Sequence, residues 1–519
     1  MHLQAEYTCD VLVVGTGLAG IRGAISAAEE GRSVLLCTAG KLFSGSSFYP
    51  GTWGLGLIGP DGVEDEEDLI DSICTLGRGM ADEHLVRTFV RGINPAVEGL
   101  KAMGVQLKQA ENKGQKDFIP CFDRKHRSWN GILFQSAKEV FSRSISDLGI
   151  RVLEHCEALK LTMDGDRVDG CIMALDGRPL WIHAGSVLLC GGGLGGLYRY
   201  RITTDDVLAS GHALALEAGA ELTNLEFMQI MPAFVTPCPK TIFNEKTFRY
   251  LQMEGVDLDP DLMELRSTHG PFTSRLADRT VDFEILRRQG EDGLACCYSA
   301  ALSQDTPEFI TTYFDWLRET HGVTMADPFR IALYAHAANG GIHIDGNGCT
   351  GVPGLYAAGE ITGGMHGADR IGGLSTANGL VFGERAGRAA AEYAVLSNCD
   401  RVEYTPVSVP DVGERRRKMQ SLMTRHAMVE RTEEGLRHAL AELEAMSVPA
   451  PGGDPLESRR LLSQLTTAKA VLTAQLMRRE SRGSHFRADH PGEDPAMAAP
   501  IRITKTKDGL RAVFHKKEG

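Results

Sequence analysis

The chain opens on an apolar run that ends in closely spaced glycines. Residues 11–14 are apolar and mostly β-branched, and the sequence GTGLAG follows at residues 15–20. Apolar residues then recur with helical spacing up to Gly31, and residues 33–37 form a second, mostly apolar run. This change of period predicts a strand, a tight turn, a helix and a second strand.

A second segment of this kind lies far along the chain, at residues 354–383. It begins with a strand pattern, passes through Gly359 and Glu360 into a loop with His366 and Arg370, and ends in a helix punctuated by glycines. Because binding residues concentrate in loops, we expect His366 and Arg370 to be exposed there. Two such segments far apart are typical of one dinucleotide-binding domain into which another domain is inserted.

Between these segments the pattern changes twice. Residues 151–193 carry short apolar runs separated by turn signals, which predicts a β-meander that leads into a central strand at residues 186–190. From residue 226 to about residue 327 the periodicity weakens and charge rises, as expected of an inserted substrate or capping domain. Beyond a linker with two prolines at residues 405–413, apolar spacing predicts two amphipathic helices.

This pattern predicts an α/β fold with four parts along the chain. Residues 1–225 and 328–407 form a Rossmann-like domain, and residues 226–327 form an α+β capping domain that interrupts it. Residues 408–519 form a C-terminal helical domain.

Composition narrows the class of protein. The chain has 519 residues, 43% hydrophobic content and a net charge of −13, which argues against nucleic acid or an anionic membrane as a partner. No apolar run reaches the ~18 residues of a transmembrane helix, and residues 1–10 are too polar for a signal peptide. The 12 cysteines include no CxxC pair, which favours reduced thiols in a cytoplasmic protein without an iron–sulfur centre of its own.

The GTGLAG segment has the chemistry of a pyrophosphate site. Gly15 permits a tight turn, Gly17 lets backbone approach the ligand, and Gly20 lets the helix pack on the strand. The alternative is a glycine-rich turn without a ligand, but the strand and helix around this motif favour dinucleotide binding. One departure is that Thr38 and Ala39 replace the acid that usually ends the second strand and binds the ribose.

Several motifs, in order along the chain, resemble the flavoprotein family of succinate dehydrogenase, fumarate reductase and L-aspartate oxidase. The resemblance covers nearly the whole chain. Besides GTGLAG, it rests on AGKLFSGSSFYPG at residues 39–51, LCGGGLGGLY at 189–198, HAANGGIHID at 336–345, GLYAAGE at 354–360, HGADRIGG at 366–373 and RRESRGSHFRADHP at 478–491.

The resemblance implies an FAD-binding domain of the GR2 type with noncovalent FAD. Family members with covalent flavin use a His in the segment that wraps the flavin, and Ser46 stands at that place here. The FAD-binding residues implied by the motifs are Gly15, Gly17, Leu18, Ala19, Gly20, Thr38, Ala39, Ser46, Ser47, Gly192, Gly359, Glu360, Ser375 and Thr376.

The implied reaction is hydride exchange between the flavin and a small carboxylic acid. Arg370 matches the family's carboxylate-binding Arg, which suits the role because a guanidinium donates two parallel hydrogen bonds. His336 matches a carboxylate-binding His. Arg279, in SRLADRTVDFEI, resembles the Arg that donates or accepts the proton, with Arg275 as its rival because Asp278 replaces the family's proline. A loop-packing role for His366 is as good an interpretation as a direct one.

Two departures leave the substrate open. Met231 stands before Pro232, where members that process dicarboxylates carry a His, and a thioether cannot donate a hydrogen bond to a carboxylate. Leu374 replaces an Asn. Three functions follow: a fumarate reductase- or succinate dehydrogenase-type enzyme with an electron-transfer partner, an L-aspartate oxidase-like enzyme, or a non-catalytic FAD electron-transfer subunit.

Overall fold

A twisted, mainly parallel sheet forms the centre of the cofactor half. The computed structural model describes residues 1–53, 55–111, 114–303 and 306–516. The strands of this sheet are β1 (His2–Val14), β2 (Val34–Cys37), β6 (Arg151–Leu153), β7 (Glu157–Asp164), β8 (Arg167–Leu175), β9 (Arg178–Leu189), β17 (Leu355–Ala357) and β19 (Arg401–Glu403). Their order is β6-β2-β1-β9-β8-β7, with β17 beside β9 and β19 beside β1. The antiparallel pairs β7–β8 and β8–β9 are the expected meander.

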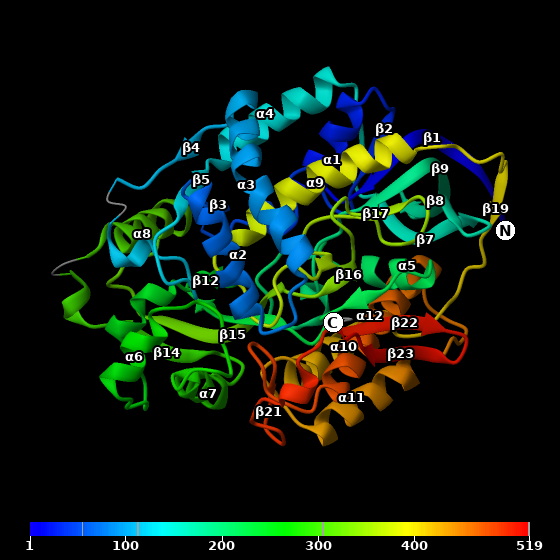
Figure 1. Cartoon of the computed structure of the whole chain (residues 1–519). Coiled ribbons are helices and arrows are strands. Elements are labelled where there is room, and N and C mark those ends of the chain that lie inside the picture. The colour runs from blue at the N-terminus through cyan, green and yellow to red at the C-terminus, as the bar shows by residue number, and fades with distance from the viewer. Residues whose placement is uncertain (54, 112–113, 304–305, 517–519) are drawn as a thin grey trace.

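The two glycine-rich segments of the sequence meet on this sheet. Helix α1 (Leu18–Glu29) and helix α9 (Leu374–Tyr393), blue and yellow in Figure 1, lie side by side. The contact is backbone to backbone, because a Cβ added at Gly387 would lie 2.2 Å from Gly23 O. The prediction that one α/β domain is built from both halves of the chain is therefore confirmed.

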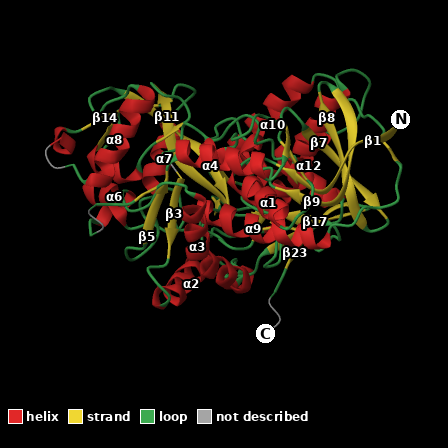
Figure 2. Cartoon of the chain, turned by 90° about the horizontal axis from the view of Figure 1, so that it is seen from above, coloured by secondary structure: helices red, strands yellow, loops and turns green. Residues whose placement is uncertain are grey.

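The inserted segment forms a second sheet with helices around it. Its elements are β11 (Met228–Thr236), β12 (Thr241–Ile242), β13 (Leu251–Met253), α6 (Pro260–Arg266), α7 (Arg279–Arg288), β14 (Leu294–Tyr298) and α8 (Glu308–His321). Strand β15 (Phe329–Ala338) lies beyond the predicted end of the insertion at residue 327 and belongs to the same sheet. The strand order is β12-β11-β15-β14-β13. In the view of Figure 2 this part lies at the opposite end of the molecule from β1, β7 and β8.

Two smaller sheets connect these parts. A three-stranded sheet β3-β5-β4 lies beside α3 and α9, and a five-stranded sheet β18-β16-β10-β22-β23 lies beside α5. The bounds of these elements, and of two further helices, are α2 (Glu64–Gly77), α3 (Glu83–Met103), α4 (Phe134–Asp147), α5 (Gly211–Glu217), β3 (Leu55–Gly59), β4 (Leu107–Lys108), β5 (Ser128–Ile132), β10 (Leu222–Thr223), β16 (Gly341–His343), β18 (Thr362–Gly363), β22 (Ile501–Thr506) and β23 (Gly509–Phe514).

The C-terminal part is helical, as expected, but it ends in a hairpin that the sequence analysis did not predict. Helices α10 (Val412–Ala427), α11 (Glu433–Met446) and α12 (Pro455–Met477) pack together, and the short strands β20 (Glu430–Arg431) and β21 (Phe486–Arg487) pair beside them. Strands β22 and β23 then return to the sheet of β10. The sequence signal for this hairpin is a short alternation of apolar and polar residues that starts at Ile501, and Ile501 and Ile503 are its fully buried positions.

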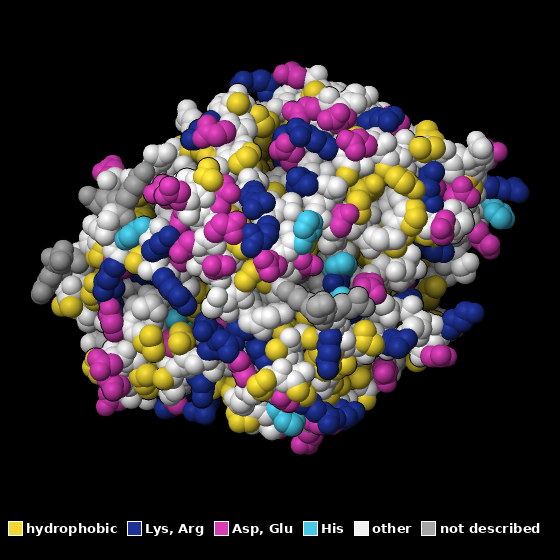
Figure 3. Space-filling view, viewed as in Figure 1, with side chains coloured by type: hydrophobic (Ala, Val, Ile, Leu, Met, Phe, Trp, Pro, Cys, Tyr) yellow, Lys and Arg dark blue, Asp and Glu magenta, His cyan; other side chains and the backbone are white. Residues whose placement is uncertain are grey.

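The molecular surface mixes charges of both signs. On the face viewed in Figure 3, acidic and basic side chains are interspersed over most elements. Among the described residues, none of the helices is both long enough and apolar enough to cross a bilayer.

Candidate active site

A cavity of about 800 Å³ runs from the GTGLAG turn to the inserted segment. It brings together residues from both halves of the cofactor domain and from the insertion. The predicted residues that line it are Gly15, Gly17, Leu18, Ala19, Thr38, Ala39, Ser46, Ser47, Gly192, His336, Gly359, Glu360, Arg370, Ser375 and Thr376. Gly20 and Arg279 are not among the described residues that line the cavity.

The three glycines of the turn have different surroundings. Gly15 has φ +118°, and an added Cβ there would lie 2.2 Å from Cys190 O. A Cβ at Gly20 would lie 1.9 Å from Gly15 O, which explains why this residue packs the helix on the turn and leaves the cavity to its neighbours. At Gly17 the nearest atom would be Ser47 Oγ at 3.4 Å, so the space in front of this backbone is open. This cradle at the start of α1 fits a pyrophosphate.

Serines and acids complete this end of the cavity. Ser47 Oγ accepts a hydrogen bond from Leu18 N at 3.1 Å, and Ser46 Oγ lies 2.7 Å from Thr203 Oγ1. Thr38 is buried and accepts from Gly40 N at 3.3 Å. Two acids that the sequence analysis did not identify, Glu157 and Asp206, also line the cavity, where Glu157 pairs with Arg460 and Asp206 accepts from Ser44 Oγ.

Glu360 is fixed by backbone rather than by a cation. Its Oε1 accepts from Ala338 N at 3.0 Å, two residues after His336. Burial raises the pKa of this carboxyl, while the Ala338 amide acts in the opposite direction. The side chain joins the loop after β17 to the end of β15.

Arg370 is the fixed cation of the cavity. Its Nε and Nη2 donate to Gln229 Oε1 at 2.8 and 2.6 Å, and its Nη1 donates to Ser375 Oγ. The side chain is buried, and burial lowers the pKa of its guanidinium to about 10, so it stays charged at neutral pH. Gln229 lies on β11 and Ser375 on α9, so both halves of the fold hold one guanidinium.

His336 faces the cavity as a neutral imidazole. It lies on β15, and its Nδ1 has no hydrogen-bond partner among the described residues. Burial first, and the Arg370 charge second, lower its pKa to about 3. A neutral His beside a fixed Arg can donate or accept a hydrogen bond without adding charge.

The two candidate proton-transfer arginines both lie in the inserted segment. Arg279 begins α7, and its Nη1 donates to Ser274 O at 2.7 Å. Arg275 donates from Nε to Asp369 Oδ2 at 3.0 Å, directly beside Arg370, and its guanidinium lies 5.8 Å from the Phe122 ring centre. Burial raises the pKa of Asp369 to about 6, with the Arg275 charge opposing that rise. The choice between the two arginines stays a prediction.

The loop of His366 and Arg370 is buried, so the expectation that both are exposed is wrong. His366 is 5% and Arg370 is 7% exposed. The His366 ring meets the Phe89 ring edge to face at 6.1 Å, and the residue is not among those that line the cavity. The cause is a covering segment, since Ser484 N and Oγ both donate to Ala368 O.

That covering segment is the RRESRGSHFRADHP motif. Besides binding Ala368, its Gly483 accepts from Ser274 N at 2.8 Å, so it holds the loops of Arg370 and Arg279 together. Arg478 anchors it through buried ion pairs with Glu226 at 2.7 Å and Glu480 at 2.8 Å. The motif therefore supports the site without lining it.

Three further polar residues of the cavity, Cys121, Glu245 and Lys246, were also missed by the sequence analysis. Cys121 Sγ donates to Glu245 Oε1 at 2.9 Å, and Lys246 Nζ donates to Ile119 O at 3.5 Å. Cys121 O also accepts from Gly372 N at 3.1 Å, which places this group next to the Arg370 loop. Each is a single residue without a local motif, so nothing in the sequence pattern identified them.

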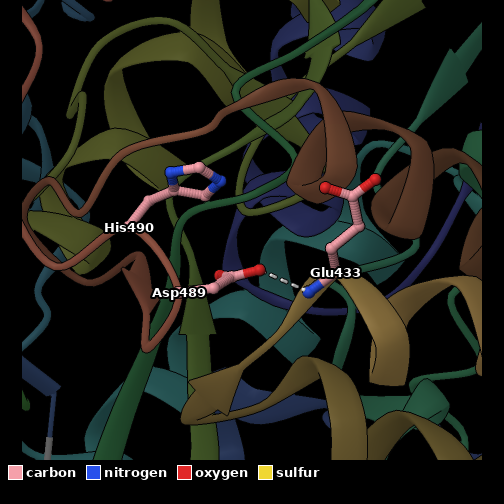
Figure 4. A group of neighbouring side chains, drawn as sticks. All are labelled: Glu433, Asp489 and His490. Carbon is pink, nitrogen blue, oxygen red and sulfur yellow. Dashed lines mark hydrogen bonds between the residues drawn. The ribbon is translucent and has the colours of Figure 1, made fainter.

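A second cluster, outside the cavity, has the residue types of a cation site. Ligand atoms of Glu433, Asp489 and His490 lie within 4.8 Å of one another (Figure 4). Asp489 already pairs with Arg487 at 2.7 Å and accepts from Glu433 N, and Glu433 pairs with Arg437. These acids are neutralised by arginines, so the cluster is assigned no metal.

The chain matches two family models. Residues 10–264 and 278–376 match the FAD binding domain, and residues 453–510 match the fumarate reductase flavoprotein C-terminal domain. The first match covers more than half of the chain. Its two ranges contain the residues that line the glycine cradle and the Arg370 loop.

Two enzyme names, fumarate reductase and L-aspartate oxidase, occur among the proteins that are similar to this chain over nearly their whole length. The chain is 27% identical to the fumarate reductase flavoprotein subunit of Mycobacterium tuberculosis, over 97% of this chain and 96% of that protein. It is 29% identical to the L-aspartate oxidase of Mycobacterium leprae, over 98% of both chains. Among solved structures, Mycobacterium smegmatis Sdh1 in complex with UQ1 has a TM-score of 0.80 and 22% identity, covering 99% of this chain and 95% of that one.

Proposed function

Because this chain belongs to the family of FAD-dependent oxidoreductases that includes fumarate reductase and succinate dehydrogenase flavoproteins and L-aspartate oxidases, we propose that it moves a hydride between FAD and a carboxylic acid. When bound, FAD supplies the two-electron acceptor or donor at its flavin ring. The open cradle at Gly17 and the serines beside it fit this cofactor. Ser46, in place of a His, supports noncovalent binding.

The observation that carries the proposal is the guanidinium of Arg370. Gln229 and Ser375 fix its plane inside the cavity, and it keeps N–H donors that these two partners do not use. A buried, fixed fork of this kind binds a carboxylate with two parallel hydrogen bonds. Electrostatic binding there also withdraws electrons from the adjoining carbon–carbon bond, which favours hydride addition at the carbon farther from the carboxylate.

His336 and an arginine of the inserted segment complete the chemistry. The neutral imidazole of His336 orients the substrate carboxylate beside Arg370. Reduction of a double bond adds a hydride to one carbon and a proton to the other, and an external donor restores the electrons. We assign the transfer of this proton to Arg279, on the resemblance of its segment, with Arg275 as the alternative. Both arginines come from the inserted segment, which contacts the Arg370 loop through Arg275 and Asp369.

A second candidate function is oxidation of an amino acid such as L-aspartate. The similarity to L-aspartate oxidases extends over nearly the whole chain, and Ser46 fits this reading as well. Met231 argues against it, because it replaces a hydrogen-bond donor where a second carboxylate is expected.

The test follows the flavin absorbance of purified protein. We expect anaerobically reduced protein to be reoxidised by an unsaturated carboxylic acid, and the oxidised protein to be unaffected by L-aspartate. Bleaching by L-aspartate with release of ammonia would establish the second function instead. A flavin that responds to no acid would indicate a non-catalytic role in electron transfer.

The partner and the location are parts of the same proposal. Buried cysteines such as Cys9, Cys37 and Cys190 are free thiols, which supports a reducing, cytoplasmic compartment. The sequence contains no CxxC pair, so we expect no iron–sulfur centre in this chain. Electrons would then reach the flavin from a separate protein or a small carrier.

A further inference from the structure

We propose that the substrate is a monocarboxylic acid whose double bond joins the carboxylate to a flat apolar group, such as a phenyl ring. The proposal rests on the proposed function, since it names the substrate class of the same cavity. Two features carry it. The first is the set of side chains at the expected place of a second carboxylate, and the second is the group of aromatic side chains that line the cavity.

The place of a second carboxylate is unfavourable for an anion. Met231 Cε, Glu245 Oε2 and Cys121 Sγ surround Gly270, at 2.8, 3.5 and 3.6 Å from the point where an added Cβ would stand. A thioether donates no hydrogen bond, and a carboxylate such as that of Glu245 repels another anion placed near it. Burial raises the pKa of the Cys121 thiol to about 12, so that this donor stays neutral and is already used by Glu245.

Aromatic rings also line the cavity. They come from the loop before β3, from β5, from the segment between β4 and β5, and from α8 of the inserted segment: Trp53, Phe118, Trp129, Phe309, Tyr313 and Trp316. The rings contact one another edge to face, with centre distances of 4.7 Å for Trp53–Phe309 and 5.3 Å for Phe118–Phe309. Such edge-to-face walls bind a flat apolar ring well.

A continuous stretch of cavity wall connects these rings to Arg370. Every residue from 117 to 121 lines the cavity, so the wall passes from Phe118 to Cys121 without interruption. Cys121 O binds Gly372 N, two residues from Arg370. The three residue steps from Phe118 to Cys121 span at most about 11 Å, so this part of the wall is long enough to contact a three-carbon acid that carries a phenyl ring.

Lys246 is the feature that a dicarboxylate substrate would use instead. It follows Glu245 in the chain and lines the cavity, and its ammonium group donates to the carbonyl of Ile119 at 3.5 Å. If a second carboxylate bound here, Lys246 would hold it, and Lys246→Met would weaken dicarboxylates selectively. With a monocarboxylate, Lys246 balances the charge of Glu245.

The experiment compares trans-cinnamate and 3-phenylpropionate with fumarate and succinate on the FAD-loaded protein. Three of the 4 tryptophans, Trp53, Trp129 and Trp316, line the cavity, so quenching of tryptophan fluorescence reports binding apart from turnover. We expect the phenyl acids to bind at least about 10-fold more tightly than the dicarboxylates, because the ring buries apolar area. We also expect cinnamate to reoxidise the reduced flavin.

Two variants distinguish the contribution of the phenyl ring to binding from that of the carboxylate. Phe309→Leu should weaken the phenyl acids about 5-fold or more and leave acrylate binding unchanged. Tyr393→Leu, at an exposed aromatic residue outside the cavity, should change neither. Retained flavin absorbance shows that each variant is folded.

The outcomes distinguish this inference from the proposed function. If fumarate binds more tightly than cinnamate, reoxidises the flavin and loses affinity in Lys246→Met, the inference is overturned and the proposed function stands. If no acid binds or reoxidises the flavin, both are overturned. Tight binding and reduction of cinnamate, with the Phe309→Leu effect, would support both.

Discussion

At the scale of single residues, the fixed orientation of Arg370 matters more than its charge. Lys246 also brings a positive charge to the cavity, but an ammonium group lacks the planar fork of a guanidinium. Gln229 and Ser375 hold that fork from two different elements. His336 adds a hydrogen bond without charge because its pKa is low.

Arg370→Lys should therefore reduce activity although the charge is kept. We expect kcat/KM to fall about 100-fold or more, since bidentate binding and its orientation are lost, while flavin absorbance stays. Arg385→Lys is the matched control, because Arg385 binds Gly346 O and Asn347 Oδ1 and does not line the cavity. Equal loss in both variants would mean a general effect on folding.

The proton-transfer role is decided by a pair of variants. We expect Arg279→Gln to keep FAD but to lower turnover by at least ~100-fold, the scale of a lost acid–base group. Arg275→Gln should lower it less, since that guanidinium is engaged with Asp369. Turnover measured under saturating substrate checks this, and the reverse order would assign the proton to Arg275.

At the scale of elements, the glycines of the turn and of the α1–α9 crossing have separate functions. Gly15 and Gly20 permit backbone contacts that a side chain would break, whereas Gly17 leaves open space that FAD needs. The crossing of α1 and α9 brings the two halves of the cofactor domain to backbone contact at Gly23 and Gly387.

Gly17→Val should give folded protein without FAD. The added Cβ would lie 3.4 Å from Ser47 Oγ, an ordinary contact, and the side chain fills the pyrophosphate cradle. We expect an unchanged far-ultraviolet circular dichroism spectrum and loss of the flavin absorbance. Full flavin occupancy in this variant would contradict the assignment of the cradle.

The packing around the glycines predicts opposite effects on stability for two glycine-to-alanine changes. In Gly387→Ala the new Cβ lies 2.2 Å from Gly23 O, so the helices must separate, at a cost of about 1–3 kcal/mol. In Gly99→Ala, on α3, the new Cβ has no atom of the described residues within 4 Å beyond its own helix and chain neighbours, so a gain of about 0.5–1 kcal/mol is expected. Thermal unfolding midpoints should move in opposite directions, and a fall in both would contradict the packing argument.

At the scale of the whole molecule, buried neutral histidines make stability depend on pH. His212 is fully buried, and burial lowers its pKa to about 4, with the Ala209 backbone acting in the opposite direction. Between pH 6.5 and 4 the unfolded chain binds a proton at this residue that the folded protein does not. Stability is therefore complete above the unfolded pKa and is lost as pH falls toward the folded one.

We expect the free energy of unfolding to fall between about pH 7 and pH 4.5, and to fall less steeply in His212→Leu. His2→Leu, at an exposed residue, is the control and should leave the change of unfolding free energy with pH as it is in the unmodified protein. Denaturant titrations at both pH values measure the slopes. Equal slopes in all three proteins would exclude His212 as a contributor.

Sequence reasoning was most successful where a function depends on local backbone. The GTGLAG turn, the meander of β7–β9 and helices α11 and α12 follow from the period of apolar residues and from glycine spacing, which act over a few neighbouring residues. The hairpin of β22 and β23 was missed because its alternation is short and its partners lie far away in the chain. The burial of the Arg370 loop was missed because its cover comes from residue 484.

The sequence by itself predicted the α/β architecture and a dinucleotide site from motifs of fixed spacing, and its family resemblance predicted FAD and the roles of Arg370 and His336. Only the tertiary structure decided the rest of the cavity: Glu245 beside Cys121, Cys121 beside Gly372, and the ring of Phe309 that α8 brings against Trp53 and Phe118. These contacts join residues that lie far apart in the chain, for which the local pattern carries no signal. The shape of the substrate site is therefore a property of the fold, and its substrate is inferred from that shape.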